Sequence, residues 1–263
     1  MEIIAIANQK GGVGKTPTTV NLGAAFVRSG HRVLLVDLDP QGSLSEYFLA
    51  EQADQLDSTI YNAIMTMEPI EPIKLGERID LLPAHDELTA AEVELPPRPN
   101  AHKRVAKILS FYTHDICLLD CPPSLGVLTI NGLAAAHKVL IPVKTELAAQ
   151  RTLKLIRRTI TEVRKSELNK EIRIWRILPT LYDSRKGHHT DVLRAIHDTY
   201  GTQVYPEPSK ESTKYNDACT LKTDVSTLDR ALGQYWDRIA VAILQEEEIT
   251  SWPENEDPAP TRR

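Results

Sequence analysis

A glycine-rich turn near the start of the chain constrains the fold more than any other feature. The turn Lys10-Gly11-Gly12-Val13-Gly14-Lys15-Thr16 follows a short apolar run at residues 3–7 and leads into a segment with apolar side chains at helical spacing. A strand, a glycine-rich turn and a helix start together direct backbone N–H groups at a polyphosphate. The sequence therefore predicts a phosphate-binding loop, in which Lys15 reaches the β- and γ-phosphates and Thr16 Oγ binds Mg²⁺.

The loop departs from the usual phosphate-loop spacing at its first position. The pattern G-x-x-x-x-G-K-[ST] requires a glycine at position 9, where this chain has Gln9, and a second lysine, Lys10, follows it. A lysine at the start of the loop lies on the side from which a second molecule would approach the nucleotide. We therefore expect Lys10 to contact phosphate in trans. A flexible turn with two surface lysines is the alternative.

Two further apolar runs end in carboxylates. The run at residues 32–40 carries Asp37 and Asp39 near its end, and the run at residues 115–120 ends in Asp120. Continuous apolar runs are typical of parallel strands covered on both faces, with function at their C-terminal ends. Asp120 therefore has the position of a Walker B aspartate beside Mg²⁺. For Asp37 and Asp39, helix capping and turn formation remain an alternative to functional roles.

Strand-like and helix-like segments alternate along the chain, which predicts an α/β fold with a doubly wound, mainly parallel sheet flanked by helices. We expect one phosphate-loop domain over residues 1–246 and a disordered, acidic, proline-rich tail over 247–263. Besides the strands already described, strands are predicted at 79–83, 139–143, 173–178 and 203–205. Helices are predicted at about 18–29, 44–50, 57–66, 86–94, 101–111, 125–136, 147–166, 188–199 and 228–246.

The composition limits the class of partner. The net charge of −5 gives no global sign of a nucleic-acid partner, so any such surface must be local. The most basic stretch is 151–176, with nine basic residues against three acidic ones. Such a stretch suits the DNA backbone, and a solvated helix face explains it almost as well.

With no secretory signal and no apolar run of about 20 residues, we expect a cytoplasmic protein without membrane contact. The three cysteines lack the spacing of a zinc or redox site.

Three motifs together carry a family resemblance. The loop, the segment Val-Asp-Leu-Asp-Pro-Gln-Gly-Ser at 36–43 and the segment Leu-Asp-Cys-Pro-Pro-Ser-Leu-Gly at 119–126 occur in order. With them the chain strongly resembles the ParA/Soj family of DNA-partition ATPases, part of the deviant-Walker class that also holds MinD and the nitrogenase iron protein. The resemblance runs from about residue 1 to 245, and the segment 180–185 also resembles a family segment.

The resemblance implies a nucleotide switch. Family members bind ATP and Mg²⁺, form a sandwich homodimer around two ATP molecules, bind DNA without sequence preference, and hydrolyse ATP slowly until a ParB-like partner stimulates them. By position, Lys10 reaches the partner subunit's ATP and Asp39 lies near the attacking water, while Lys15 and Asp120 complete the catalytic set. The metal site is assigned to Thr16, Asp37 and Asp120. Nucleotide contacts are assigned to Gly11, Gly12, Val13, Gly14, Lys15, Thr16, Pro17, Tyr182, Asp183 and Pro208, and DNA contacts to Arg185, Lys210 and Lys214.

One residue departs from the family pattern. Family loops generally continue Lys-Thr-Thr or Lys-Ser-Thr, and here Pro17 follows Thr16. A proline is tolerated in the first helical turn, because its N–H would have no partner within the helix. The missing N–H and hydroxyl are the groups that would reach the α-phosphate. We therefore expect weaker nucleotide binding, but not its loss.

Other functions compete with plasmid or chromosome partition. A ParA-like ATPase that positions a protein cargo on the nucleoid would use identical chemistry. A MinD-like membrane ATPase would need a basic C-terminal amphipathic helix, where this chain has Glu246-Glu247-Glu248. An iron–sulfur reductase would need cysteines placed to hold a cluster, and a biosynthetic ligase would need a further substrate pocket. With no helix-turn-helix segment before the first strand, we do not expect operator binding. The expected location is the cytoplasm, in association with the nucleoid.

Overall fold

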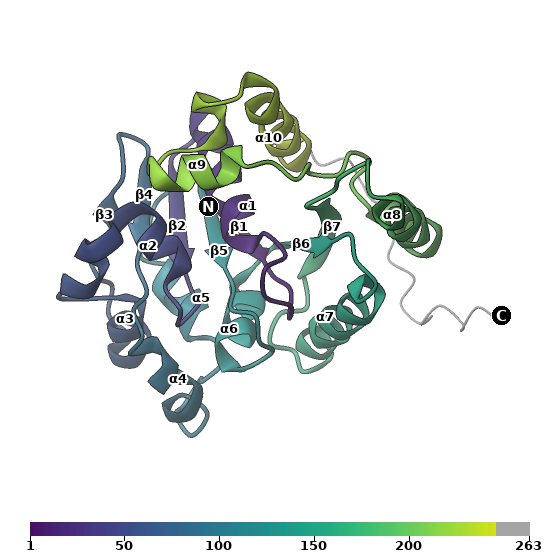
Figure 1. Cartoon of the computed structure of the whole chain (residues 1–263). Helices are drawn as coiled ribbons and strands as arrows, with labels where there is room; N and C mark the ends of the chain where they lie inside the picture. Colours follow the sequence, from purple (N-terminus) through teal and green to yellow (C-terminus); the bar gives the residue numbers. More distant parts are fainter. Residues whose placement is uncertain (246–263) are drawn as a thin grey trace.

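The computed structural model describes residues 1–245 and is built around one seven-stranded sheet, with strand order β3-β4-β2-β5-β1-β6-β7 (Figure 1). All neighbouring strands run parallel except β3, which pairs antiparallel with β4 at one edge. This arrangement confirms the predicted fold class. The strands are β1 (Glu2–Ile6), β2 (Val33–Asp37), β3 (Ile73–Lys74), β4 (Ile79–Leu82), β5 (Ile116–Asp120), β6 (Lys138–Lys144) and β7 (Arg173–Thr180).

Helices cover both faces of the sheet, as a doubly wound topology requires. The helices α1, α2 and α10 pack on one face, and α3 to α7 pack on the other. The α-helices are α1 (Lys15–Arg28), α2 (Ser43–Leu49), α3 (Ile60–Thr66), α4 (Leu88–Glu94), α5 (Arg104–Leu109), α6 (Val127–Ala135), α7 (Ala149–Lys165), α8 (Gly187–Tyr200), α9 (Lys214–Thr220) and α10 (Arg230–Leu244). Short 3₁₀ helices are η1 (Ala50–Gln55), η2 (Gly201–Gln203) and η3 (Val225–Thr227).

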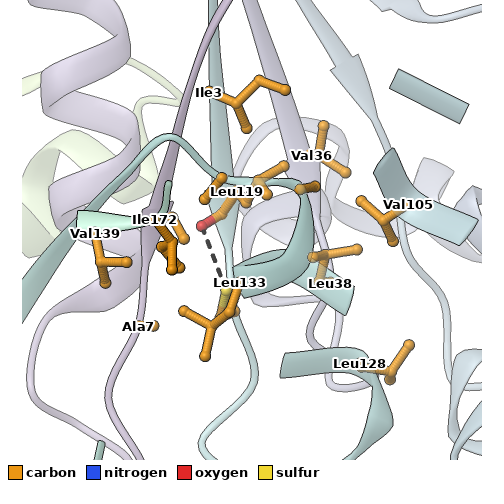
Figure 2. Packing of buried hydrophobic residues seen from close by; sticks show 14 of the residues in the cluster. Ile3, Ala7, Val36, Leu38, Val105, Leu119, Leu128, Leu133, Val139 and Ile172 are labelled. Atoms are coloured by element: carbon orange, nitrogen blue, oxygen red, sulfur yellow. Dashed lines mark hydrogen bonds between the residues drawn. The ribbon is translucent and has the colours of Figure 1, made fainter. Parts of the chain in front are cut away.

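The core consists of two apolar layers, one on each face of the sheet. Successive side chains of a strand point to opposite faces, so the buried run of β1 divides between the layers. Ile4 and Ile6 pack with α1 and α10, whereas Ile3 and Ala5 face α6 and its neighbours. Figure 2 shows part of the second layer, which includes Ile3, Leu119 and Leu133 of α6. The central strands are therefore fixed in position, and their C-terminal ends meet at one edge.

Turn and capping residues in the sequence mark where helices α1 and α10 end or begin. Helix α1 stops at Arg28, just before Gly30, whose φ of +94° lies in the left-handed region that glycine adopts without strain. Helix α10 begins after Asp229, whose carboxylate accepts hydrogen bonds from the backbone N–H groups of Ala231 and Leu232. No helix within residues 1–245 is long and apolar enough to cross a membrane.

Two local predictions differ from the structure, and two elements were not predicted. The strand predicted at 203–205 is wrong, because η2 occupies residues 201–203 and only an isolated bridge joins Val204 to Ile177. The helix predicted at about 101–111 is shorter and spans Arg104–Leu109. Helix α9 and the two-residue strand β3 were not predicted. The tail predicted over 247–263 lies outside the described residues.

Candidate functional site

The glycine-rich loop is held in place by hydrogen bonds from the sheet. Asn8 Nδ2 donates to the Pro142 carbonyl at 2.7 Å, and Asn8 Oδ1 accepts from the backbone N–H of Lys10 at 3.1 Å. Thr180 Oγ1, at the end of β7, donates to the Val13 carbonyl at 2.7 Å. Gly14 has a φ of +87°, which a side chain would strain, so glycine is required at this turn. The loop therefore has a fixed shape before any ligand binds.

Lys15 is the first residue of α1 and its side chain turns inward. The residue is 7% exposed, and its Nζ lies 3.5 Å from the Lys10 carbonyl oxygen, which accepts the hydrogen bond. Burial lowers the pKa of Lys15, while the negative charges of Asp120 and Asp39 oppose that shift. The ammonium group thus lies near the carboxylates at the strand ends. Its contact with the β- and γ-phosphates stays a prediction.

The two buried carboxylates lie side by side. Asp37 and Asp120 are register partners at the ends of β2 and β5. Thr16 Oγ1 donates to Asp120 Oδ2 at 2.6 Å. Burial, followed by the charge of Asp37, raises the pKa of Asp120 to about 8, despite the opposing effects of the Thr16 hydrogen bond and of Lys15. Burial also raises the pKa of Asp37 to about 6. A pair of carboxylates this close calls for positive charge nearby.

These residues fit a Mg²⁺ ion held together with nucleotide phosphates. Within the described residues, Asp120 Oδ1 is a buried oxygen with no hydrogen-bond partner, and the Thr16 hydroxyl lies against the other oxygen of the same carboxylate. Mg²⁺ in nucleotide sites takes one or two protein oxygens and completes its shell with phosphates and water. Thr16 and Asp120 therefore suit direct ligation.

Asp37 is bound differently from Asp120. Its Oδ2 accepts from the Ser45 hydroxyl at 2.7 Å and from the Ser45 backbone N–H at 2.9 Å, and its Oδ1 accepts from the Asp39 backbone N–H at 3.1 Å. Both oxygens are already engaged, so this geometry favours a role through a bridging water. The predicted direct ligation by Asp37 stays a prediction.

Asp39 lies outside the buried pair, in the turn after β2. It is partly exposed, and its Oδ1 accepts from the Gln41 backbone N–H at 3.0 Å. The hydrogen bond from Gln41 agrees with a turn-forming role for Asp39, and the residue is partly open to solvent. A water-orienting role for Asp39 stays a prediction.

A cavity of about 240 Å³ opens beside the start of α1. Gly14, Pro17 and Thr18 form its wall on the loop side, and Thr180 and Leu181 line it from the end of β7. A second wall comes from Ser209, Glu211, Ser212, Thr213, Tyr215, Asn216 and Trp236. The cavity continues the phosphate loop away from Lys15, so it is a candidate site for the base and sugar of a nucleotide. A larger cavity of about 580 Å³, between α1, η1, β3 and η3, has no lining residue from the loop within the described chain.

Of the nucleotide contacts predicted beyond the phosphate loop, Tyr182, Asp183 and Pro208 lie next to this cavity, whereas Ser209, in the same predicted loop as Pro208, lines it. Tyr182 directs its hydroxyl toward Thr190 of α8, 3.2 Å away. The Asp183 carboxylate accepts two hydrogen bonds from the Arg185 guanidinium, at 2.9 and 2.8 Å. Pro208 precedes Ser209, whose N–H donates to the Pro179 carbonyl. Their roles stay predictions, and the cavity adds Leu181 as a candidate.

Lys10 turns away from Lys15. Its ammonium group forms an ion pair with Glu146, in the loop between β6 and α7, and its side chain is 37% exposed. Gly11 and Gly12, which follow it, are exposed as well. Glu146 was not among the predicted site residues, because nothing in the sequence pairs it with a loop 136 positions earlier.

The predicted DNA contacts gather around one short segment of backbone. Lys210 forms an isolated bridge with Tyr182, close in sequence to Arg185, and Lys214 begins α9. The Arg185 side chain is 88% exposed. Arg185 pairs with Asp183 and Lys214 pairs with Asp217. In α7, Arg151, Lys154 and Lys165 are exposed.

A mainly parallel sheet, a phosphate loop closed by Lys15 and Thr16, and an aspartate at the end of the neighbouring strand define a P-loop ATPase. A family model described as an AAA domain matches residues 1–174. The chain belongs to the ParA/Soj family, as its resemblance predicts. Two partition-protein relatives carry this assignment, and a solved structure shares the fold.

Two relatives align with this chain over most of their own length. The sporulation initiation inhibitor protein Soj of Bacillus subtilis is 38% identical over 222 residues, which span 82% of this chain and 87% of Soj. The chromosome partitioning protein ParA of Caulobacter vibrioides is 36% identical over 238 residues, 87% of this chain and 88% of that protein.

A solved structure from Mycobacterium smegmatis shares the fold with a TM-score of 0.80 at 35% identity, over 94% of this chain and 95% of that one. It is described as cobyrinic acid a,c-diamide synthase with bound ADP and magnesium.

Replacing Pro17 tests the α-phosphate contact. Pro17→Ala restores a backbone N–H, and Pro17→Thr adds a hydroxyl as well. A hydrogen bond to a charged group contributes about 1.5–3 kcal/mol, so we expect Pro17→Ala to bind ATP roughly tenfold more tightly and Pro17→Thr to bind at least as tightly. Titration calorimetry measures the Kd of each protein. Equal Kd values for all three would show that the α-phosphate does not reach residue 17.

The raised pKa of Asp120 predicts a pH-dependent stability in the nucleotide-free protein. Because the pKa rises from 3.8 to about 8 on folding, the stabilising contribution is full below pH 4 and is lost as the pH rises through 8. Asp120→Asn carries no such titration and keeps an acceptor for Thr16. Its free energy of unfolding, relative to wild type, should increase from pH 5 to pH 8.5 by on the order of a few kcal/mol.

Urea unfolding without nucleotide or Mg²⁺ measures this difference. Asp86→Asn, which removes an exposed carboxylate, controls for the loss of one negative charge. A difference between Asp120→Asn and wild type that stays constant over this pH range would contradict the assignment.

Proposed function

We propose that this ParA/Soj-type ATPase is an ATP-dependent switch that moves a plasmid or chromosome. ATP binding brings two copies together as a sandwich dimer, and that dimer binds DNA without regard to sequence. A ParB-like adaptor on the cargo then stimulates slow hydrolysis and returns the protein to the monomer. In this cycle the protein associates with the nucleoid while ATP is bound.

The different environments of the two loop lysines carry this proposal. Lys15 is buried among the carboxylates of its own subunit, whereas Lys10 lies outward with a partly exposed side chain. A nucleotide in the cis site needs only one lysine for its β- and γ-phosphates. A second lysine at the open side of the loop can serve a nucleotide held by another copy. Dimerisation then depends on ATP, because the negative charge that Lys10 binds is on the phosphates of the other copy's nucleotide.

The chemistry follows from charge and position. Thr16 and Asp120 would hold Mg²⁺, which neutralises charge on the β- and γ-phosphate oxygens when it is bound. Lys15 stabilises the same charge from inside the site, and Asp39 orients the attacking water. Lys10 of the second subunit adds positive charge as the phosphoryl group leaves. Because phosphoryl transfer depends mainly on such positioning, the rate responds to whether the second subunit is in place.

The proposed DNA contacts are Arg185, Lys210 and Lys214, supported by their exposure on neighbouring segments. A dimer doubles this set of cations and places both copies on one duplex. Affinity for the DNA backbone rises steeply with the number of phosphates neutralised, so a weak monomer surface becomes an effective dimer surface.

DNA binding in different nucleotide states tests the switch. We expect wild-type protein to bind a random-sequence duplex with a slowly hydrolysed ATP analogue, and at least tenfold more weakly with ADP or no nucleotide. Lys10→Ala should bind equally weakly in all three states, because it cannot complete the partner's site. Fluorescence anisotropy measures binding, and its salt dependence reports the number of phosphate contacts.

Lys107→Ala is the matched control, since Lys107 is an exposed lysine of α5, which packs on the face of the sheet opposite α1. DNA binding that is independent of nucleotide, or that Lys10→Ala leaves unchanged, would overturn the proposal.

A further inference from the structure

The side chain of Lys10 is held by its own subunit. Its ammonium group pairs with Glu146, which follows β6 and precedes α7. The second oxygen of the Glu146 carboxylate lies 3.6 Å from Lys144 Nζ. One carboxylate therefore faces two lysines, one from the phosphate loop and one from the end of the strand that supports it.

The backbone of Lys10 is fixed while its side chain is only partly enclosed. Its N–H donates to Asn8 Oδ1, and its carbonyl oxygen accepts from Lys15 Nζ. Asn8 is in turn bonded to the Pro142 carbonyl in β6. Moving the ammonium group from Glu146 toward another molecule thus needs side-chain rotations of Lys10, without a rearrangement of the loop. Such rotations are fast in partly exposed residues.

Lys144 keeps Glu146 paired when Lys10 leaves. The Glu146 side chain is 26% exposed, so a carboxylate left with no cation would lose favourable interactions in a partly desolvated position. Lys144 already lies close enough to take over the pairing. Glu146 is thus paired with a cation whether Lys10 stays or leaves. A modest free-energy gain from a partner's phosphates is then enough to shift the population toward the arrangement in which Lys10 has left Glu146.

We infer that Glu146 is a positioning residue that holds Lys10 in cis and sets how much ATP is needed for dimerisation, and that Lys144 sets the strength of this hold. The inference rests on the proposed role of Lys10 in trans. Glu146 competes with the partner's ATP for one ammonium group, and Lys144 competes with Lys10 for one carboxylate. Removing Glu146 or Lys144 should therefore shift dimerisation in opposite directions.

The test compares wild type with Glu146→Gln, Lys144→Gln and the surface control Lys107→Gln. The first measurement is the acetylation rate of Lys10 by an N-hydroxysuccinimide ester without nucleotide, read by mass spectrometry. The second is the ATPγS concentration at half-maximal dimerisation, read by analytical ultracentrifugation. The Kd of a fluorescent ATP analogue at low protein concentration verifies that each variant keeps its cis site.

A partly exposed ion pair changes an equilibrium by about two- to fivefold. Glu146→Gln should therefore raise Lys10 acetylation and lower the half-maximal ATPγS concentration by about that factor, and Glu146→Asp should largely restore the wild-type values. Lys144→Gln should do the opposite, while Lys107→Gln should match wild type.

Unchanged Lys10 acetylation in Glu146→Gln, or weaker dimerisation of that variant, would overturn the inference and leave the proposed function intact. A failure of the proposed function would give a different result. All of these proteins would then stay monomeric at saturating ATPγS, which also removes the role of Glu146 in dimerisation, even where Lys10 acetylation still reports the ion pair.

Discussion

The burial of two adjacent carboxylates is the constraint on which the site depends. Asp37 and Asp120 face each other in register at the ends of β2 and β5, and burial raises the pKa of both. A fold keeps such groups only when hydrogen bonds or opposite charge compensate for lost hydration. Ser45 satisfies Asp37 with two hydrogen bonds, whereas Asp120 receives one from Thr16 and the field of Lys15. The remaining oxygen of Asp120 explains why this edge of the sheet suits a metal ion carried by a nucleotide.

The phosphate loop places two lysines of equal charge in different environments. The first turn of α1 carries Lys15 into the carboxylate pair, and the glycines before it leave Lys10 outside. We propose on this basis that one loop responds both to its own nucleotide and to a second molecule. We predict that Pro17 weakens the first of these functions, since it removes a donor from the helix start, where a proline is tolerated. In the role that we infer for it, Glu146 modifies the second, because it offers Lys10 a partner within the same subunit.

The sequence predicted most elements whose signal is local. The buried strands were recognisable from continuous apolar runs, and the loop from its glycines. Helix α9 was missed because it buries Ala218 alone and so shows no apolar periodicity. The run Gln203-Val204-Tyr205 resembled a strand, yet after η2 only an isolated bridge joins it to the sheet. The candidate nucleotide cavity was only partly predictable, since its walls come from segments about 200 positions apart that share no local pattern.

The central claim is that each active site is completed by a lysine from a second copy. Mixing Lys10→Ala, which keeps its cis nucleotide site, with Lys15→Ala, which keeps Lys10 but lacks the cis phosphate lysine, tests this directly. In a mixed dimer, the nucleotide on the Lys10→Ala subunit receives Lys10 from the other subunit. The account predicts that ATP hydrolysis by the mixture clearly exceeds the sum of the two separate variants and depends on total protein concentration. Hydrolysis equal to that sum at every mixing ratio would contradict it.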